Sequence, residues 1–133
     1  MRVVLDTNVF IAAVAADGLC RDLVRIRLLP HAIITSEPLL RELRTTAREK
    51  FAVDANELPL LSQLRDEAEI VAPARLAKRV CRDKDDDVVL ATAVAGEADV
   101  IVTGDDDLLV LKRFREIAII SPRQFLELLD RQS

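Results

Sequence analysis

Two aspartates follow short apolar runs that have the composition of buried strands. Val3 to Leu5 leads directly to Asp6, and Val100 to Val102 leads shortly afterwards to Asp105. Runs of this kind are typical of parallel sheets, which bind ligands beyond the carboxyl ends of their strands. Carboxylates gathered there could hold a metal ion or transfer protons. The sequence therefore predicts that Asp6 and Asp105 share one acidic site.

Two further acids are expected to face the same site from helices. Glu42 borders the apolar stripe of Leu39 and Leu43, and Asp86 lies one turn before Leu90 at the head of the most apolar helix. Each acid alone has an ordinary explanation as a cap, a turn residue or a solvated side chain. Four acids from four elements that all point to the core or the sheet edge are better explained by a shared function.

The acidic run from Asp83 to Asp87 contains two rivals to Asp86. Asp85 and Asp87 stand on either side of it. Only Asp86 has the helical phase of the buried stripe, because the residues three, four and seven positions later are apolar. Asp83 has the spacing of a helix cap. We therefore expect Asp86 to be the functional acid of this run.

A cluster of carboxylates needs positive charge, since desolvated like charges raise one another's pKa values. No Lys or Arg is expected among the site-facing residues of these motifs to supply it. His31 is the only histidine, so a zinc site based on histidine is not expected. Cys20 and Cys81 have no metal-binding spacing, and we interpret both as reduced thiols. Oxygen ligands alone select Mg²⁺ or Mn²⁺, which activate water against a phosphodiester.

The elements that must position these acids alternate between strands and helices, which predicts a parallel sheet covered on both faces. Strands are expected over residues 3–5, 32–35, 69–71, 100–102 and 117–120. Helices are expected over residues 9–16, 19–29, 37–51, 54–68, 83–95 and 108–111, with a last helix from Pro122 onward. Thr7 or Asn8 is expected to cap the first helix, and Pro59 to start or kink the helix over residues 54–68.

The composition fits a single domain over residues 1–133 with a core of aliphatic side chains. Four Phe and no Tyr or Trp argue against a stacking platform for bases, and a net charge of −4 argues against a generally basic nucleic-acid binder. Neither a signal peptide nor a membrane-spanning run is expected, so we expect the protein to be cytoplasmic. Leu19, Leu23 and Ile26 form a stripe for core packing or for a partner's helix.

The acids in their chain order resemble the PIN-domain nucleases, above all the bacterial toxin-like PIN proteins related to the VapC toxins. The segments that carry the resemblance are Asp6-Thr7-Asn8, Glu42, Lys84-Asp85-Asp86-Asp87 and Thr103-Gly104-Asp105-Asp106-Asp107. It extends over nearly the whole chain. It implies a three-layer α/β/α fold with a central parallel sheet of four to five strands. It also implies Mg²⁺-dependent cleavage of single-stranded RNA, a homodimer or higher oligomer, and a cognate antitoxin as partner.

The resemblance also assigns roles to residues. The catalytic acids it implies are Asp6, Glu42, Asp86 and Asp105. The metal ligands it implies are Asp6, Asp86 and Asp105, with Asp107 as a further candidate. Asn8 and Thr103 would orient the acids or the waters of the metal. Apart from the resemblance, the candidates for contact with the RNA backbone are Arg41, Arg44, Arg79 and Arg82, with Arg48 beside them, and the alternative explanation for each is an ordinary solvated surface residue.

Two other functions remain open from the sequence. A phosphohydrolase acting through an aspartyl nucleophile at Asp6 would need a second acid two residues later, where the chain has Asn8. A non-catalytic interaction protein with a PIN-like fold would not need the complete set of acids. Metal titration separates an inert protein from a nuclease, and trapping of a phosphoryl group on Asp6 tests the phosphohydrolase.

Overall fold

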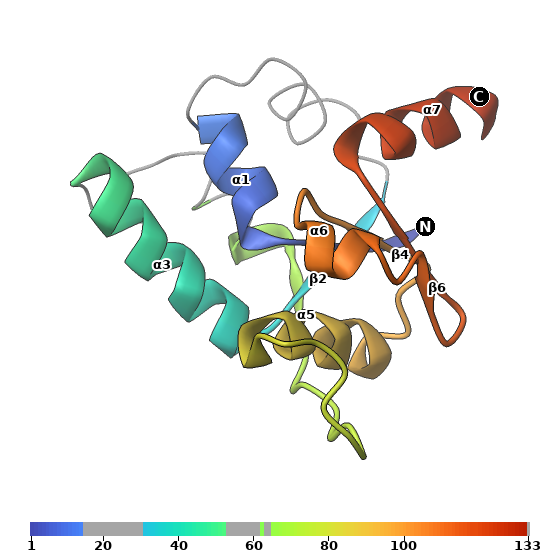
Figure 1. Cartoon of the computed structure of the whole chain (residues 1–133). Helices are drawn as coiled ribbons and strands as arrows, with labels where there is room; N and C mark the ends of the chain where they lie inside the picture. The colour runs from blue at the N-terminus through green and yellow to red at the C-terminus, as the bar shows by residue number, and fades with distance from the viewer. Residues whose placement is uncertain (15–30, 53–61, 63–64, 133) are drawn as a thin grey trace.

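The computed structural model describes residues 1–14, 31–52, 62 and 65–132, and strands from these residues form one six-stranded sheet in the order β3-β2-β1-β4-β6-β5 (Figure 1). The strands are β1 (Arg2–Leu5), β2 (Ala32–Thr35), β3 (Glu69–Ile70), β4 (Val100–Val102), β5 (Arg113–Phe114) and β6 (Ile117–Ile120). The helices are α1 (Thr7–Val14), α3 (Glu37–Phe51), α5 (Lys84–Ala95), α6 (Asp106–Leu109) and α7 (Pro122–Gln132).

Five of these strands run parallel, as the alternation of strands and helices predicts. Strand β1 lies in the middle, with β2 on one side and β4 on the other, and β4 pairs with β6. The sequence prediction missed β5, which pairs antiparallel with β6 and makes the sheet larger than four to five parallel strands. Two residues among charged neighbours carry no alternating pattern, so β5 has no signal in the sequence.

The sheet separates two apolar clusters, which gives the three layers that the resemblance implies. Val3 and Leu5 of β1 point to one face, where they pack with Phe10 of α1 and Phe125 of α7. Val4 points to the other face and packs in the cluster that contains residues of α5 and α6. Successive side chains of a strand alternate between faces, so a continuous apolar strand is buried on both sides. Figure 1 shows α1 and α7 on one side of the sheet and α5 on the other.

Two helices, α1 and α6, are capped by aspartates and begin earlier than the sequence predicts. Helix α1 begins at Thr7, two residues earlier than expected, and the Asp6 carboxylate accepts hydrogen bonds from the N–H groups of Thr7 and Asn8. The expectation that Thr7 or Asn8 caps this helix was therefore wrong. Helix α6 also begins two residues early, because Asp105 accepts a hydrogen bond from the N–H of Asp107. Carboxylates satisfy N–H groups that have no partner within the helix.

A buried pair of hydroxyls fixes α3 against α5. The Thr92 hydroxyl donates to the Val88 carbonyl at 2.8 Å, so the Ser36 hydroxyl, 2.8 Å away, is the donor in the bond between the two side chains. Ser36 stands at the N-cap position of α3 but makes no side-chain cap bond, since its hydroxyl contacts Thr92 instead. The pair sets how the helix of Glu42 lies relative to the helix of Asp86.

Some expectations fall on residues that the structure does not describe. They are the helix over residues 19–29 with the stripe of Leu19, Leu23 and Ile26, the thiol of Cys20, and most of the helix over residues 54–68. Among the described residues, no helix has the length and apolar character that crossing a membrane requires.

Candidate metal centre

The first acid of the site lies where β1 and β4 end side by side. Leu5 is paired with Val102, and the N–H of Asp6 donates to the Val102 carbonyl at 3.0 Å. The fully buried Thr103 hydroxyl donates to the Asp6 carboxylate at 2.7 Å and accepts from the N–H of Asp105 at 3.0 Å. One threonine thus connects the two aspartates that follow neighbouring strands.

Asp86 brings a third acid to this edge from the first turn of α5. Carboxylate oxygens of Asp86, Asp105 and Asp107 lie within 4.8 Å of one another. Asp86 is 8% exposed, and burial raises its pKa to about 7 together with a hydrogen bond to Asp105 and the charges of Asp105, Asp83 and Asp6. A hydrogen bond between two carboxyl groups requires that one of them is protonated. The two acids therefore lie too close together for both to be ionised easily.

The pKa of Asp6 is also raised, although hydrogen bonds to its carboxylate offset part of the shift. Burial raises the pKa of Asp6, and the charge of Asp105 raises it further. The Thr103 hydroxyl and the N–H groups of Asn8 and Thr7 lower it, because each donates a hydrogen bond to the ionised form. The net direction is upward, which means that these donors do not compensate for the lost hydration.

Glu42 faces the acids from α3, although it lies further out. Its side chain is half-buried, and burial raises its pKa, followed by the charges of Asp6, Asp85 and Asp83. The helical phase that places Leu39 and Leu43 in the core therefore turns Glu42 toward the site. Asp83 and Asp85 are exposed and add negative charge at the start of α5.

The neighbours of Asp86 have other contacts. The Asp83 carboxylate caps α5 by accepting from the N–H of Asp85 at 2.9 Å. The Asp87 carboxylate accepts from the N–H groups of Val80 and Cys81 at 3.0 and 2.8 Å, which ties down the segment before α5. Sequence reasoning missed this role of Asp87, because the path of an irregular segment has no periodic signal.

The predicted supporting and RNA-contacting residues divide into three groups. Thr103 contacts the acids directly, whereas the Asn8 side chain is exposed and only its backbone N–H reaches Asp6. Arg82 donates to Asp107 at 2.8 Å, and Arg79 donates to backbone carbonyls of its own segment. Arg41 and Arg44 lie on the outer face of α3 and line a pocket of about 310 Å³, whose described lining also includes Thr45, Arg48 and Glu49.

The Arg82 contact corrects one expectation. The acidic motifs were expected to lie without a basic partner, but Arg82 stands just before the run of acids and pairs with Asp107 across the site. Its guanidinium does not neutralise the buried acids of the site, since the pKa values of Asp6 and Asp86 are raised in its presence. An oxygen-only donor set with uncompensated charge fits a hard divalent cation.

The fold and this acidic edge define the class of protein. A family model described as PIN domain matches residues 2–107, so the chain belongs to the PIN-domain family. PIN domains are generally nucleases and typically use divalent metals. The resemblance drawn from the order of the acids is confirmed at the level of the family.

Two comparisons place the chain among individual proteins. It is 27% identical to the uncharacterized protein MJ1680 of Methanocaldococcus jannaschii over 142 aligned positions, which cover 96% of this chain and 90% of that protein. Its fold is similar to a chain in the crystal structure of VapBC2 from Rickettsia felis bound to a DNA fragment from their promoter. That match has a TM-score of 0.63 at 17% identity and covers 91% of this chain and 98% of the other. It confirms the predicted α/β/α fold.

Proposed function

We propose that the chain is a Mg²⁺-dependent ribonuclease that cleaves single-stranded RNA by means of an activated water molecule. The observation that carries the proposal is the cluster of Asp86, Asp105 and Asp107 at one sheet edge, to which Thr103 connects Asp6, and where burial raises the pKa values of Asp6 and Asp86. Membership of the PIN-domain family supports a phosphodiester substrate. RNA, and single-stranded RNA in particular, is proposed from the likeness to the toxin-like members.

The position of each acid suggests its role in the proposed reaction. Asp6, Asp86 and Asp105 would hold the ion, with Asp107 as a further ligand, and Mn²⁺ can take the place of Mg²⁺. The ion supplies positive charge to a phosphate and activates water. Glu42 lies beside this group on another helix, and its raised pKa makes its carboxylate a better acceptor for the proton of the attacking water.

Thr103 acts on the acids as a positioning residue. Its hydroxyl can donate only one proton, which goes to Asp6, while its oxygen accepts from the N–H of Asp105. The Asp6 carboxylate is therefore held in one orientation relative to the backbone of Asp105 before any ion arrives, and the Asp105 carboxylate is held by the N–H of Asp107. The backbone N–H of Asn8 supports Asp6 in the same way. Such supporting contacts commonly change metal affinity or activity by about 10- to 100-fold when removed.

Basic side chains beside the acids would guide the RNA backbone. Arg41 and Arg44, with Arg48, form a positive surface on the outer face of α3, the helix that carries Glu42. Arg79 and Arg82 lie in the segment before α5, and Arg82 contacts Asp107 of the site. A chain with a net charge of −4 needs such local positive surfaces to attract a polyanion.

Cleavage of a labelled single-stranded RNA by the purified chain tests the proposal. Wild-type protein with Mg²⁺ is expected to cut, EDTA to stop the reaction, and Asp6→Asn or Asp86→Asn to lower the rate by more than about 100-fold. Asp106→Asn is the matched control, because Asp106 is an exposed neighbour of Asp105. Equal cleavage by wild type and Asp6→Asn would mean that a contaminant is the nuclease.

We also propose that the chain is the toxin of a toxin–antitoxin pair, acting in the cytoplasm as a homodimer or higher oligomer. The structural neighbour is a VapBC2 assembly bound to DNA from its own promoter, which supports a search for an antitoxin partner. Expression of the chain is expected to arrest growth, and coexpression of a small neighbouring reading frame to restore it. Growth arrest by the Asp6→Asn variant as well would contradict this role.

A further inference from the structure

Arg82 is held in place by the segment that carries it. The Asp87 carboxylate accepts from the N–H groups of Val80 and Cys81, the two residues before Arg82. The guanidinium of Arg79 donates to the carbonyls of Cys81 and Arg82 at 3.2 and 2.6 Å. The Cys81 side chain is buried. The backbone from Val80 to Arg82 is therefore held by hydrogen bonds, and the Arg82 side chain leaves it from a defined point.

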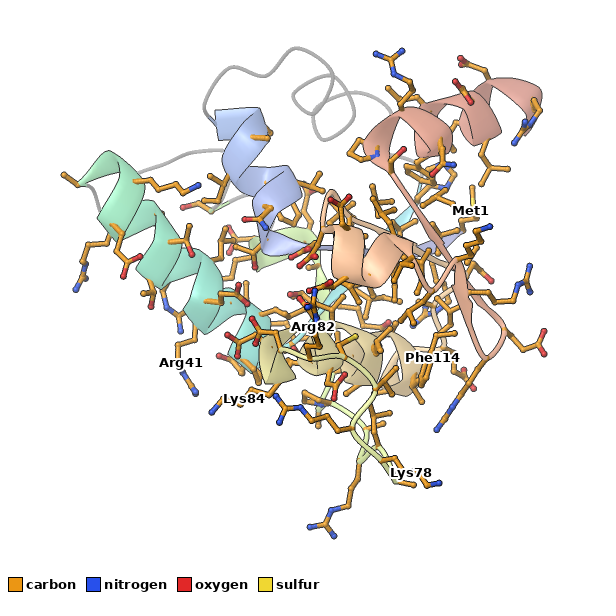
Figure 2. All side chains as sticks on the ribbon, viewed as in Figure 1. Met1, Arg41, Lys78, Arg82, Lys84 and Phe114 are labelled. Carbon is orange, nitrogen blue, oxygen red and sulfur yellow. The ribbon has the colours of Figure 1, made fainter. Side chains whose placement is uncertain are left out.

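The side chain of Arg82 reaches from the segment before α5 to α6 and ends on an acid of the candidate metal centre. Its guanidinium donates to the Asp107 carboxylate, with 2.8 Å between Nη2 and Oδ1. Oxygens of the same Asp107 carboxylate, Asp86 and Asp105 lie within 4.8 Å of one another. Figure 2 shows Arg82 between α5 and α6, whereas Arg41 and Lys84 point outward.

The guanidinium and a metal ion therefore need the same carboxylate. If the ion displaces Arg82, it must break the ion pair, and if Asp107 bridges both, a unit positive charge stays beside a dication. Either arrangement lowers the affinity of the site for the ion. The Arg82 side chain is 87% exposed, so the pair can open without unfolding the segment, and solvent moderates its strength.

We propose that Arg82 is a built-in competitor of the metal ion for Asp107, so that the empty site keeps a counter-ion which a divalent cation must displace. The inference rests on the proposed function for the place of the ion, but it concerns binding and does not require cleavage. Because the pair is largely exposed to solvent, its removal is expected to tighten metal binding by only about two- to fivefold.

The test is Mn²⁺ titration of the full chain without RNA, followed by the EPR signal of the free ion. Arg82→Gln is compared with Lys84→Gln, which removes one exposed positive charge two residues away. Arg82→Gln is expected to tighten binding about two- to fivefold, and Lys84→Gln is expected to tighten it by a clearly smaller factor. Equal effects of the two variants, or no tightening by Arg82→Gln, would overturn the competition.

A double-variant cycle supplies the second criterion. In an Asp107→Asn background, Arg82→Gln is expected to give no further gain in affinity, because the contested carboxylate is gone. A gain that persists there would contradict the proposal. Absence of Mn²⁺ binding in every variant would overturn both this inference and the metal dependence of the proposed nuclease. Metal binding with the expected coupling but without RNA cleavage would refute the nuclease alone.

Discussion

Asp86 offers the sharpest test of whether the acidic edge is strained for lack of a cation. Its carboxyl is 8% exposed and shares a hydrogen bond with Asp105, and burial is the first cause that raises its pKa to about 7. Replacement by Asn keeps the size and can still donate to Asp105, but it removes the ionised form. We expect Asp86→Asn to stabilise the metal-free protein at alkaline pH.

The direction follows from proton linkage. The folded protein holds the Asp86 proton more tightly than the unfolded chain, whose pKa is near the usual 3.8. Between about pH 4 and pH 7 the unfolded state therefore binds fewer protons, and stability falls as the pH rises. Below this window Asp86 is neutral in both states and adds no penalty, and above it the full penalty is present.

The size of the penalty follows from the same values. The difference between about 7 and 3.8 corresponds to about 4 kcal/mol, at about 1.4 kcal/mol for each tenfold change in proton affinity. Solvent at the mouth of the site and small shifts of the carboxylates reduce this figure. We expect Asp86→Asn to raise the free energy of unfolding by about 2–4 kcal/mol at pH 8 and by less than about 0.5 kcal/mol at pH 3.5.

Urea unfolding in EDTA, followed by far-UV circular dichroism, measures the effect, since the chain has no Trp or Tyr for fluorescence. Asp106→Asn is the control, because this exposed neighbour should change stability by less than about 0.5 kcal/mol. Saturating Mg²⁺ is expected to stabilise wild type more than Asp86→Asn and so reduce the difference. An Asp86→Asn variant that is less stable than wild type at pH 8 would refute the electrostatic reasoning.

Three further outcomes are expected. Gly96→Ala should lower the free energy of unfolding by about 1–3 kcal/mol, because the new Cβ would lie 2.5 Å from Cγ2 of the buried Ile34; an unchanged urea midpoint would contradict that packing. Ser36→Ala should lower the free energy of unfolding by about 1–2 kcal/mol, measured in the same way, and its loss combined with Thr92→Val should be smaller than the sum of the single losses, since both remove the bond between the two hydroxyls and only Thr92→Val also removes the bond to Val88; additive losses would mean that the hydroxyls act separately. Mg²⁺ at about 100 times its dissociation constant should raise the free energy of unfolding by about 2.7 kcal/mol, and the melting temperature should return to its starting value after EDTA; a melting temperature that ignores Mg²⁺ would argue against a metal centre.

Local patterns were sufficient for most of the fold. Apolar runs such as Val100 to Val102 are buried strands wherever two faces are covered, and the helical phase of Asp86 follows from the residues within two turns of it. The short strand β5 and the early start of α1 were missed, because two-residue strands and aspartate caps depend on a few backbone bonds and not on periodicity.

The sequence by itself determined which acids could form a site: Asp6 and Asp105 follow buried strands, and Asp86 lies on a buried helical face. Only the tertiary structure decided which side chains contact one another. The hydroxyl of Thr103 reaches Asp6 because β4 lies next to β1, although 97 positions separate the two residues. The pairing of Arg82 with Asp107 depends in the same way on how α5 and α6 lie together. Contacts between distant segments are set by the packing of the whole core, in which many registers compete, and no short stretch of sequence carries that choice.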